Sequence, residues 1–149
     1  MEIKYSAEQP VKVELMGARK RLNYNIRELG ESEIKELWEK ESDTPYDYFA
    51  KEHKYAYNTL TIGGARFNYN NMVEEIIRDK YTADEMEAIT NNMNVIVAEF
   101  FNVLVTDGIA QAIKYLLTSI KEDNMANFKA MQEWRAMAKR EARDILKMY

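Results

Sequence analysis

His53 and Glu99 are the two side chains best suited to catalysis by type and position. His53 is the single histidine, so a zinc site with two histidine ligands is excluded. It recurs with Phe49 and Tyr57 at helical spacing, which favours a hydrogen-bonded packing role. Glu99 lies in the most apolar stretch of the chain, where an ionised carboxylate is costly unless a cation or a donor meets it. Three interpretations of Glu99 stay open: a pocket carboxylate, a polar seam or an exposed face.

The motifs that bind nucleotides or activate a nucleophile are missing from the sequence. It contains no Gly-x-Gly-x-x-Gly, no phosphate loop and no Gly-x-Ser-x-Gly. It also contains no cysteine, which excludes disulfides, thiolate metal sites and cysteine nucleophiles. We therefore predict a non-enzymatic protein with no catalytic residue, no metal site and no cofactor. A small enzyme with Glu99 in a helical pocket is a less favoured alternative.

Positive charge gathers at two places, although the chain is acidic overall. The net charge of −4 gives no general attraction to phosphate backbones. Local basic clusters nevertheless define an alternative function, that of a helical nucleic-acid-associated protein. Such clusters are more often solvated faces. They comprise Arg19, Lys20 and Arg21 near the N-terminus, and Arg140 and Arg143 in the last helix.

The longest regular pattern predicts a helix from about 83 to 105. Thr82 precedes Glu85 by three residues, which is the spacing of a capping box, and apolar residues then recur every three or four positions. The stretch from Val95 to Val105 is apolar around almost the whole helix, and a helix of this kind is normally covered on every side. We therefore expect a central helix, with Phe100 in the core.

A second apolar segment follows Thr106-Asp107-Gly108 and ends near Ile120, which predicts a helical hairpin or a bent helix. Together the two segments are long enough to cross a bilayer. Glu99, Asp107 and Lys114 interrupt them, however, and each costs roughly 2.5 to 3.5 kcal/mol at the centre of a membrane helix. No run of about 18 uninterrupted apolar residues exists, so we expect a core helix and no membrane.

The rest of the chain divides into segments of different pattern within one expected domain, residues 1–149. Residues 1–16 alternate apolar and polar side chains, which predicts a strand arm that pairs within the chain or with another subunit. Residues 18–122 are expected to form the helical core, with a hairpin or an extended loop at 59–69, and residues 124–148 a C-terminal helix. The expected fold is mainly α, a helical domain around a central apolar helix with a small N-terminal β arm or hairpin.

An abundance of tyrosine favours contacts with other proteins. The chain has ten tyrosines, and tyrosine supplies large, stiff contact area at interfaces. The last helix also carries a stripe of Met, Trp and Ala that packs on its own domain or on a neighbour. We predict a structural or assembly protein that contacts copies of itself and other proteins. The residues predicted to carry these contacts are Val11, Val13, Leu15, Tyr46, Tyr48, Trp134 and Tyr149.

The segment Ile76–Asn92, with the sequence IIRDKYTADEMEAITNN, resembles stretches of small virion and assembly proteins of tailed bacteriophages. The resemblance rests on a short helix, a tyrosine and a capped acidic helix, and it carries no catalytic residue. It implies a virion component such as a connector, a tail protein or an assembly accessory. No signal peptide is visible at the N-terminus, so the expected location is the cytoplasm or a virion assembled there.

Overall fold

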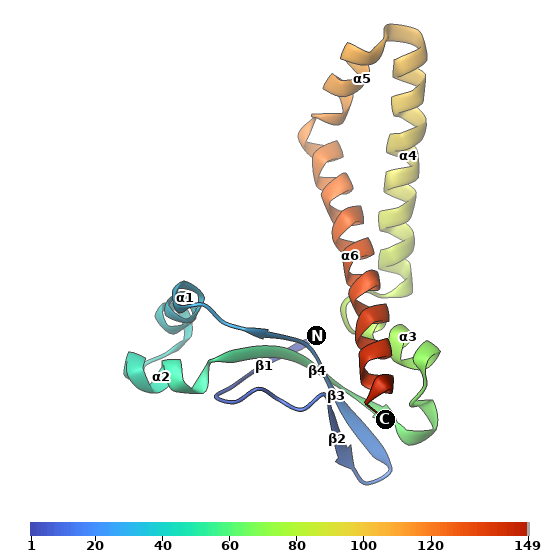
Figure 1. Ribbon diagram of the computed structural model, residues 1–149. Helices are drawn as coiled ribbons and strands as arrows, with labels where there is room; N and C mark the ends of the chain where they lie inside the picture. Colours follow the sequence, from blue (N-terminus) through green and yellow to red (C-terminus); the bar gives the residue numbers. More distant parts are fainter. Residues whose placement is uncertain (149) are drawn as a thin grey trace. The chain divides into compact units, whose positions relative to one another are not determined.

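Helices make up most of the protein and a small antiparallel sheet accompanies them, so the predicted mainly α fold is confirmed (Figure 1). The computed structural model describes residues 1–148, and Tyr149 lies outside the described residues. The chain divides into two compact units. We call them the sheet unit, which comprises residues 1–79 and the segment from Met137 onward, and the hairpin unit, Lys80–Ala136.

The sheet pairs the two N-terminal strands with later strands of the same chain. Within residues 1–148 the strand order is β1 (Glu2–Ser6), β4 (Tyr55–Gly63), β3 (Arg19–Glu28) and β2 (Val13–Met16). Each neighbouring pair is antiparallel. Because β1 pairs with β4 and β2 with β3, the N-terminal arm makes its ladder hydrogen bonds inside the chain.

Two segments within residues 18–122, the expected helical core, are strands of this sheet. β3 occupies most of the region between Gly17 and Gly30, and its alternate side chains Leu22 and Tyr24 are fully buried. β4 continues without a turn to Gly63, and a short 3₁₀ turn follows at Gly64–Arg66. The hairpin considered for residues 59–69 is therefore absent, because β4 pairs with β3 and β1 instead of folding back on itself.

Two helices cover one face of the sheet: α3 (Tyr69–Lys80) and the C-terminal part of α6 (Ser119–Lys147). Val13 stands opposite Leu22 in the β2–β3 ladder, so both side chains point to that face. Apolar side chains from the strands and the two helices pack there into the main core of the sheet unit. This cluster comprises Val13, Leu22, Ile62, Met72, Ala142 and Ile145.

A second cluster in the sheet unit lies under α1 (Glu31–Glu41) and α2 (Tyr46–Glu52). α2 begins directly after Pro45. The helix ends at Glu52, so Tyr57 belongs to β4 and not to this helix. The buried residues of this cluster are Leu29, Ile34, Phe49 and Ala56.

The hairpin unit contains α4 (Ala83–Asp107), α5 (Ile109–Leu116) and the first part of α6, so the predicted helical hairpin is confirmed (Figure 1). The capping box is present, because the Glu85 amide donates to the Thr82 hydroxyl at 3.1 Å and the Thr82 amide to the Glu85 carboxylate at 2.8 Å. Gly108 separates α4 from α5 with a φ of 87°. Glycine adopts such a left-handed value without strain.

The expectation that α4 is covered on every side is wrong. Ile96 is its buried residue, and Phe100 is only partly buried. α4 is long and apolar enough to cross a membrane by length and composition, yet only 6% of its most apolar window is buried inside the protein. The helix contacts α5 on one side. Much of its remaining apolar surface is exposed in the described part of the chain.

Candidate functional site

Most exposed apolar side chains of α4 and α5 lie in two rows on the hairpin, and Val95 on the other side of α4 is the exception. Their exposed fractions run from 40% at Val97 to 86% at Val105. Within each row the positions are four residues apart, so the side chains of one row project from neighbouring turns of the helix. We call these residues the hairpin face. They are Val97, Phe101 and Val105 on α4, and Ile109, Ile113 and Leu117 on α5 and at its C-terminal cap.

The two rows lie on the same side of the hairpin. One residue step turns about 100° around a helix. Val97 directly follows the buried Ile96, so its side chain points about 100° further around α4. Ile113 directly follows the buried Ala112, so its side chain points about 100° further around α5. The two helices contact each other and run in opposite directions (Figure 1). Equal steps on antiparallel helices lead to the same side, so the rows form one continuous surface.

The hairpin face is uncharged and large. Asn94, Ala98 and Asn102 flank its α4 row, and α4 contains neither lysine nor arginine. Six side chains of this size and exposure present on the order of 700 Å², whereas the largest apolar patch on a typical monomer is about 300–600 Å². Charged residues are depleted from the centres of protein interfaces. The size and composition of the face therefore suit protein docking.

Glu99 lies on the exposed polar side of α4 and has a hydrogen-bond partner. The Tyr115 hydroxyl of α5 donates to Glu99 Oε2. Desolvation, the hydrogen bond and the nearby Glu99 charge raise the pKa of Tyr115 to about 12. Asn92, Asn102 and Thr106, which share the stripe of Glu99, are exposed as well. Of the three interpretations of Glu99, the structure supports the exposed face.

His53 has the packing role that its sequence context predicted. Its Nδ1 lies 2.8 Å from the Phe49 carbonyl oxygen. Its ring stacks on Phe49 with 3.7 Å between ring centroids and an interplanar angle of 11°. The ring of Tyr5 lies 5.0 Å away on β1. The imidazole thus connects α2 to the edge strand of the sheet.

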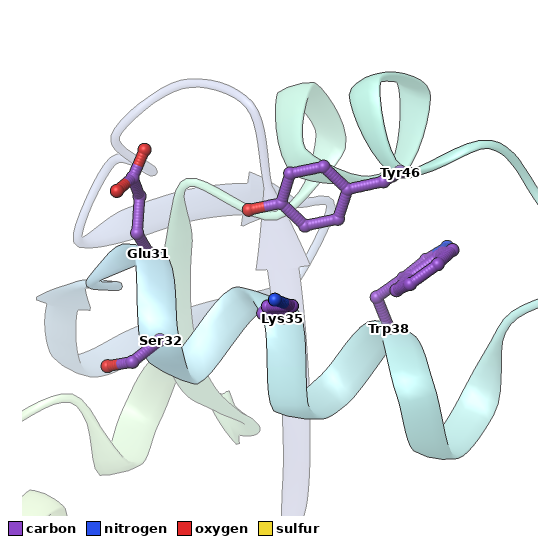
Figure 2. Close-up of a pocket in the computed structure, with 5 residues that line it drawn as sticks. All are labelled: Glu31, Ser32, Lys35, Trp38 and Tyr46. Carbon is purple, nitrogen blue, oxygen red and sulfur yellow. The ribbon is translucent and has the colours of Figure 1, made fainter.

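A recess of about 430 Å³ lies between α1 and α2. In Figure 2 the Tyr46 ring extends from α2 with its hydroxyl toward the side where Glu31 stands. The Trp38 indole N–H donates to the Thr44 carbonyl at 2.7 Å, and the Trp38 and Tyr46 rings meet edge to face at 5.5 Å. Charged groups of both signs beside aromatic rings suit a polar ligand. The lining residues include no histidine that could activate the Ser32 hydroxyl as a nucleophile. The lining residues are Glu31, Ser32, Lys35, Trp38 and Tyr46.

The structure separates the residues that the sequence predicted as contact residues. Val13 is buried in the core of the sheet unit, and Trp134 is buried in the hairpin unit, where Lys80 Nζ lies 4.6 Å from its ring centroid. Neither side chain is available to a partner. Tyr46 is half-buried against Trp38. Exposed positions remain at Val11, Leu15 and Tyr48, and Tyr149 lies outside the described residues.

The two basic clusters do not form one surface. Arg19 and Arg21 alternate with Lys20 and Leu22 along β3, so they point away from the face that α3 and α6 cover. Lys20 lies over the Phe67 ring at 3.8 Å, and Arg21 pairs with Glu14 at 3.3 Å. Arg140 and Arg143 are exposed on α6, on the opposite side of the sheet. Within residues 1–148 this separation gives the nucleic-acid alternative no continuous basic patch.

A polar network that the sequence pattern did not indicate surrounds Tyr24. This fully buried side chain donates its hydroxyl to Asp79 of α3. Its neighbour Asn25 has a φ of 52° at a shift in strand register. The backbone N–H of Asn25 donates to Glu141 Oε1 at 3.3 Å, and the Lys12 ammonium pairs with the same carboxylate at 3.2 Å. The network therefore ties β3 to both covering helices.

We expect Tyr24→Phe to cost about 1–3 kcal/mol, because Asp79 loses its donor. Burial and the adjacent Asp79 raise the pKa of Tyr24 above its ordinary value. The stabilisation from the neutral phenol is therefore complete below about pH 10 and is lost at higher pH, by about 1.4 kcal/mol per pH unit, as the unfolded state ionises. Urea unfolding from pH 8 to 11 checks this. The variant should lack that part of the alkaline loss, and equal slopes would contradict the assignment.

The spacing that forms the hairpin face was visible in the sequence, where it indicated core residues. Repeats of four at Val97–Phe101–Val105 and Ile109–Ile113–Leu117 are the signal that could have revealed two parallel rows. Periodicity alone did not tell whether the chain itself covers them.

Comparison of the chain with protein-family models, with curated proteins and with solved structures finds no match.

Proposed function

We propose that this protein is a non-catalytic assembly protein that acts through protein–protein contacts of its hairpin face. The observation that supports the proposal is the incomplete cover of α4. A helix that is apolar nearly all round is normally buried on every side. In the described residues α5 covers one side, while Phe101, Val105 and the exposed row of α5 stay open. The missing cover is best supplied by another molecule.

The energy available at the hairpin face is sufficient for association. Full burial of a Val, Leu, Ile or Phe side chain contributes about 1.5–3 kcal/mol. The six residues are on average a little over half exposed, so covering them contributes on the order of 5–10 kcal/mol from one partner. Association costs an estimated 4–15 kcal/mol in lost freedom. A partner surface that is equally apolar contributes a similar amount, so the sum of the two contributions favours the complex over the separate molecules.

The resemblance of Ile76–Asn92 to assembly proteins of tailed bacteriophages agrees with this function. The segment spans the C-terminal end of α3, the capping box and the first turns of α4. It leads directly into the helix that carries half of the hairpin face. We therefore include a role as a virion component, a connector, tail or accessory protein, in the proposal.

Replacing Phe101 or Ile113 by lysine tests whether the hairpin face is a surface. We expect the monomer of each variant to keep its helical circular dichroism and, compared with the monomeric wild-type chain, to lose about 1 kcal/mol or less of stability, because both side chains are roughly half exposed. Asn92→Lys on the polar side of α4 is the matched control. Thermal unfolding and circular dichroism check the result. A collapse of helicity in Phe101→Lys but not in Asn92→Lys would mean that the face belongs to a core, and the proposed function would fail.

A further inference from the structure

We infer that the partner of the hairpin face is a second copy of this chain, packed face to face about a two-fold axis. The inference rests on the proposed function and names its partner. A two-fold pair uses the same patch on both copies, so the patch must tolerate its own image. The hairpin face meets this condition, because its residues are all aliphatic or aromatic and no charge meets its symmetry mate.

The arrangement of the rows matches a known mode of helix packing. Val97, Phe101 and Val105 form a ridge of residues four apart, and Ile109, Ile113 and Leu117 form a second ridge of equal length. Ridges of this type fit into each other's grooves when two helices cross at about −50°, the commonest class of helix packing. A two-fold axis that lies in the interface, parallel to the hairpin, lays α4 of one copy over α5 of the other. The product is a four-helix arrangement with both rows of both copies covered.

The size of the face also fits a pair. Two copies that cover each other's face bury on the order of 1,400 Å², and stable specific interfaces bury about 1,200–2,000 Å². A second copy therefore completes the cover that α4 lacks.

The charge pattern of α4 argues against a lipid surface as the occupant. Helices that lie on membranes carry lysine and arginine on their polar face to meet anionic lipids. α4 has none, and its charged residues are all acidic: Asp84, Glu85, Glu87, Glu99 and Asp107. The polar side of α4 therefore repels the headgroups that would have to attract it.

Single cysteines in this cysteine-free chain test the pair. Phe101→Cys and Ile113→Cys place a thiol in each row, and Asn92→Cys places one half a turn around α4 from Phe101. With a short bis-maleimide linker, the two face variants should form covalent dimers on the order of a hundredfold faster than the control, because pairing raises the effective thiol concentration from about ten micromolar to about one millimolar. A mixture of the two face variants should cross-link best. Light scattering of the unmodified chain should give twice the monomer mass of 17.5 kDa.

Three outcomes overturn the inference. Equal cross-linking of Asn92→Cys and the face variants, or a monomer mass in a chain whose Phe101→Lys variant stays folded, would show that the face is open but does not bind its own copy. In that case the proposed function survives with a different protein partner. Flotation of the purified chain with phosphatidylcholine–phosphatidylglycerol vesicles, lost in Phe101→Lys, would assign the face to a membrane. Unfolding of the lysine variants would instead remove the proposed function itself.

Discussion

Deleting residues 1–16 should abolish the cooperative folding of the sheet unit. The deletion removes β1 and β2, and an isolated two-stranded pair of β3 and β4 is marginally stable at best. It also removes Val13 from the main core and Tyr5 from the cluster under α1 and α2. The hairpin unit keeps its own buried residues Ile96, Ala112 and Met131. We therefore expect its helices to stay folded.

The two tryptophans allow each unit to be followed separately. Trp38 lies in the sheet unit and Trp134 in the hairpin unit, and variants that keep only one of them report on that unit alone. After the deletion, Trp38 emission should shift to the red while Trp134 emission stays blue. Leu15→Ala in the full-length chain is the control, because this β2 side chain is 76% exposed and should cost less than about 0.5 kcal/mol. An unchanged Trp38 melting curve after the deletion would contradict the expected role of the edge strands.

The bounds of α4 and the start of α5 followed from local chemistry, which is why the sequence predicted them well, whereas α5 ends at Leu116 and not near Ile120 as expected. Thr82 and Glu85 satisfy each other's backbone donors at the start of α4, and Gly108 supplies the left-handed turn at its end. Whether an apolar helix is buried does not follow from local chemistry, because burial depends on where other segments of the structure lie. An apolar surface looks the same in a sequence whether its own chain or another molecule buries it. The exposure of Val105 and Ile109 therefore required the structure.

β3 shows how long-range pairing overrides a local pattern. Leu22, Ile26 and Leu29 recur at spacings of four and three, which suits a helix. The ladder with β4, some 35 residues further on, fixes the strand instead and buries Leu22 and Tyr24 on one face. The same pairing explains why Val13, a predicted contact residue, is a core residue. Nothing within residues 1–16 reveals that α6 returns from the far end of the chain to cover it.

Ile145→Ala should be among the most destabilising single substitutions in the sheet unit. Ile145 is fully buried where α6 meets the sheet, with Leu22 and Met72 in the same cluster. Truncation of such a side chain to alanine costs about 2–5 kcal/mol, because it removes buried methyl groups and leaves a cavity. That loss is a large share of the roughly 5–15 kcal/mol of a typical folded domain.

Ile120→Ala is the matched control for this experiment, because it makes the same chemical change in the same helix at a residue that is 70% exposed. It should change stability by no more than about 0.5 kcal/mol. Urea unfolding followed through Trp38 measures the effect in the sheet unit. A loss below about 1 kcal/mol for Ile145→Ala would mean that the C-terminal part of α6 is not packed on the sheet in solution. A selective loss at Ile145 would instead show that the last turns of the chain hold together a sheet built from its first residues.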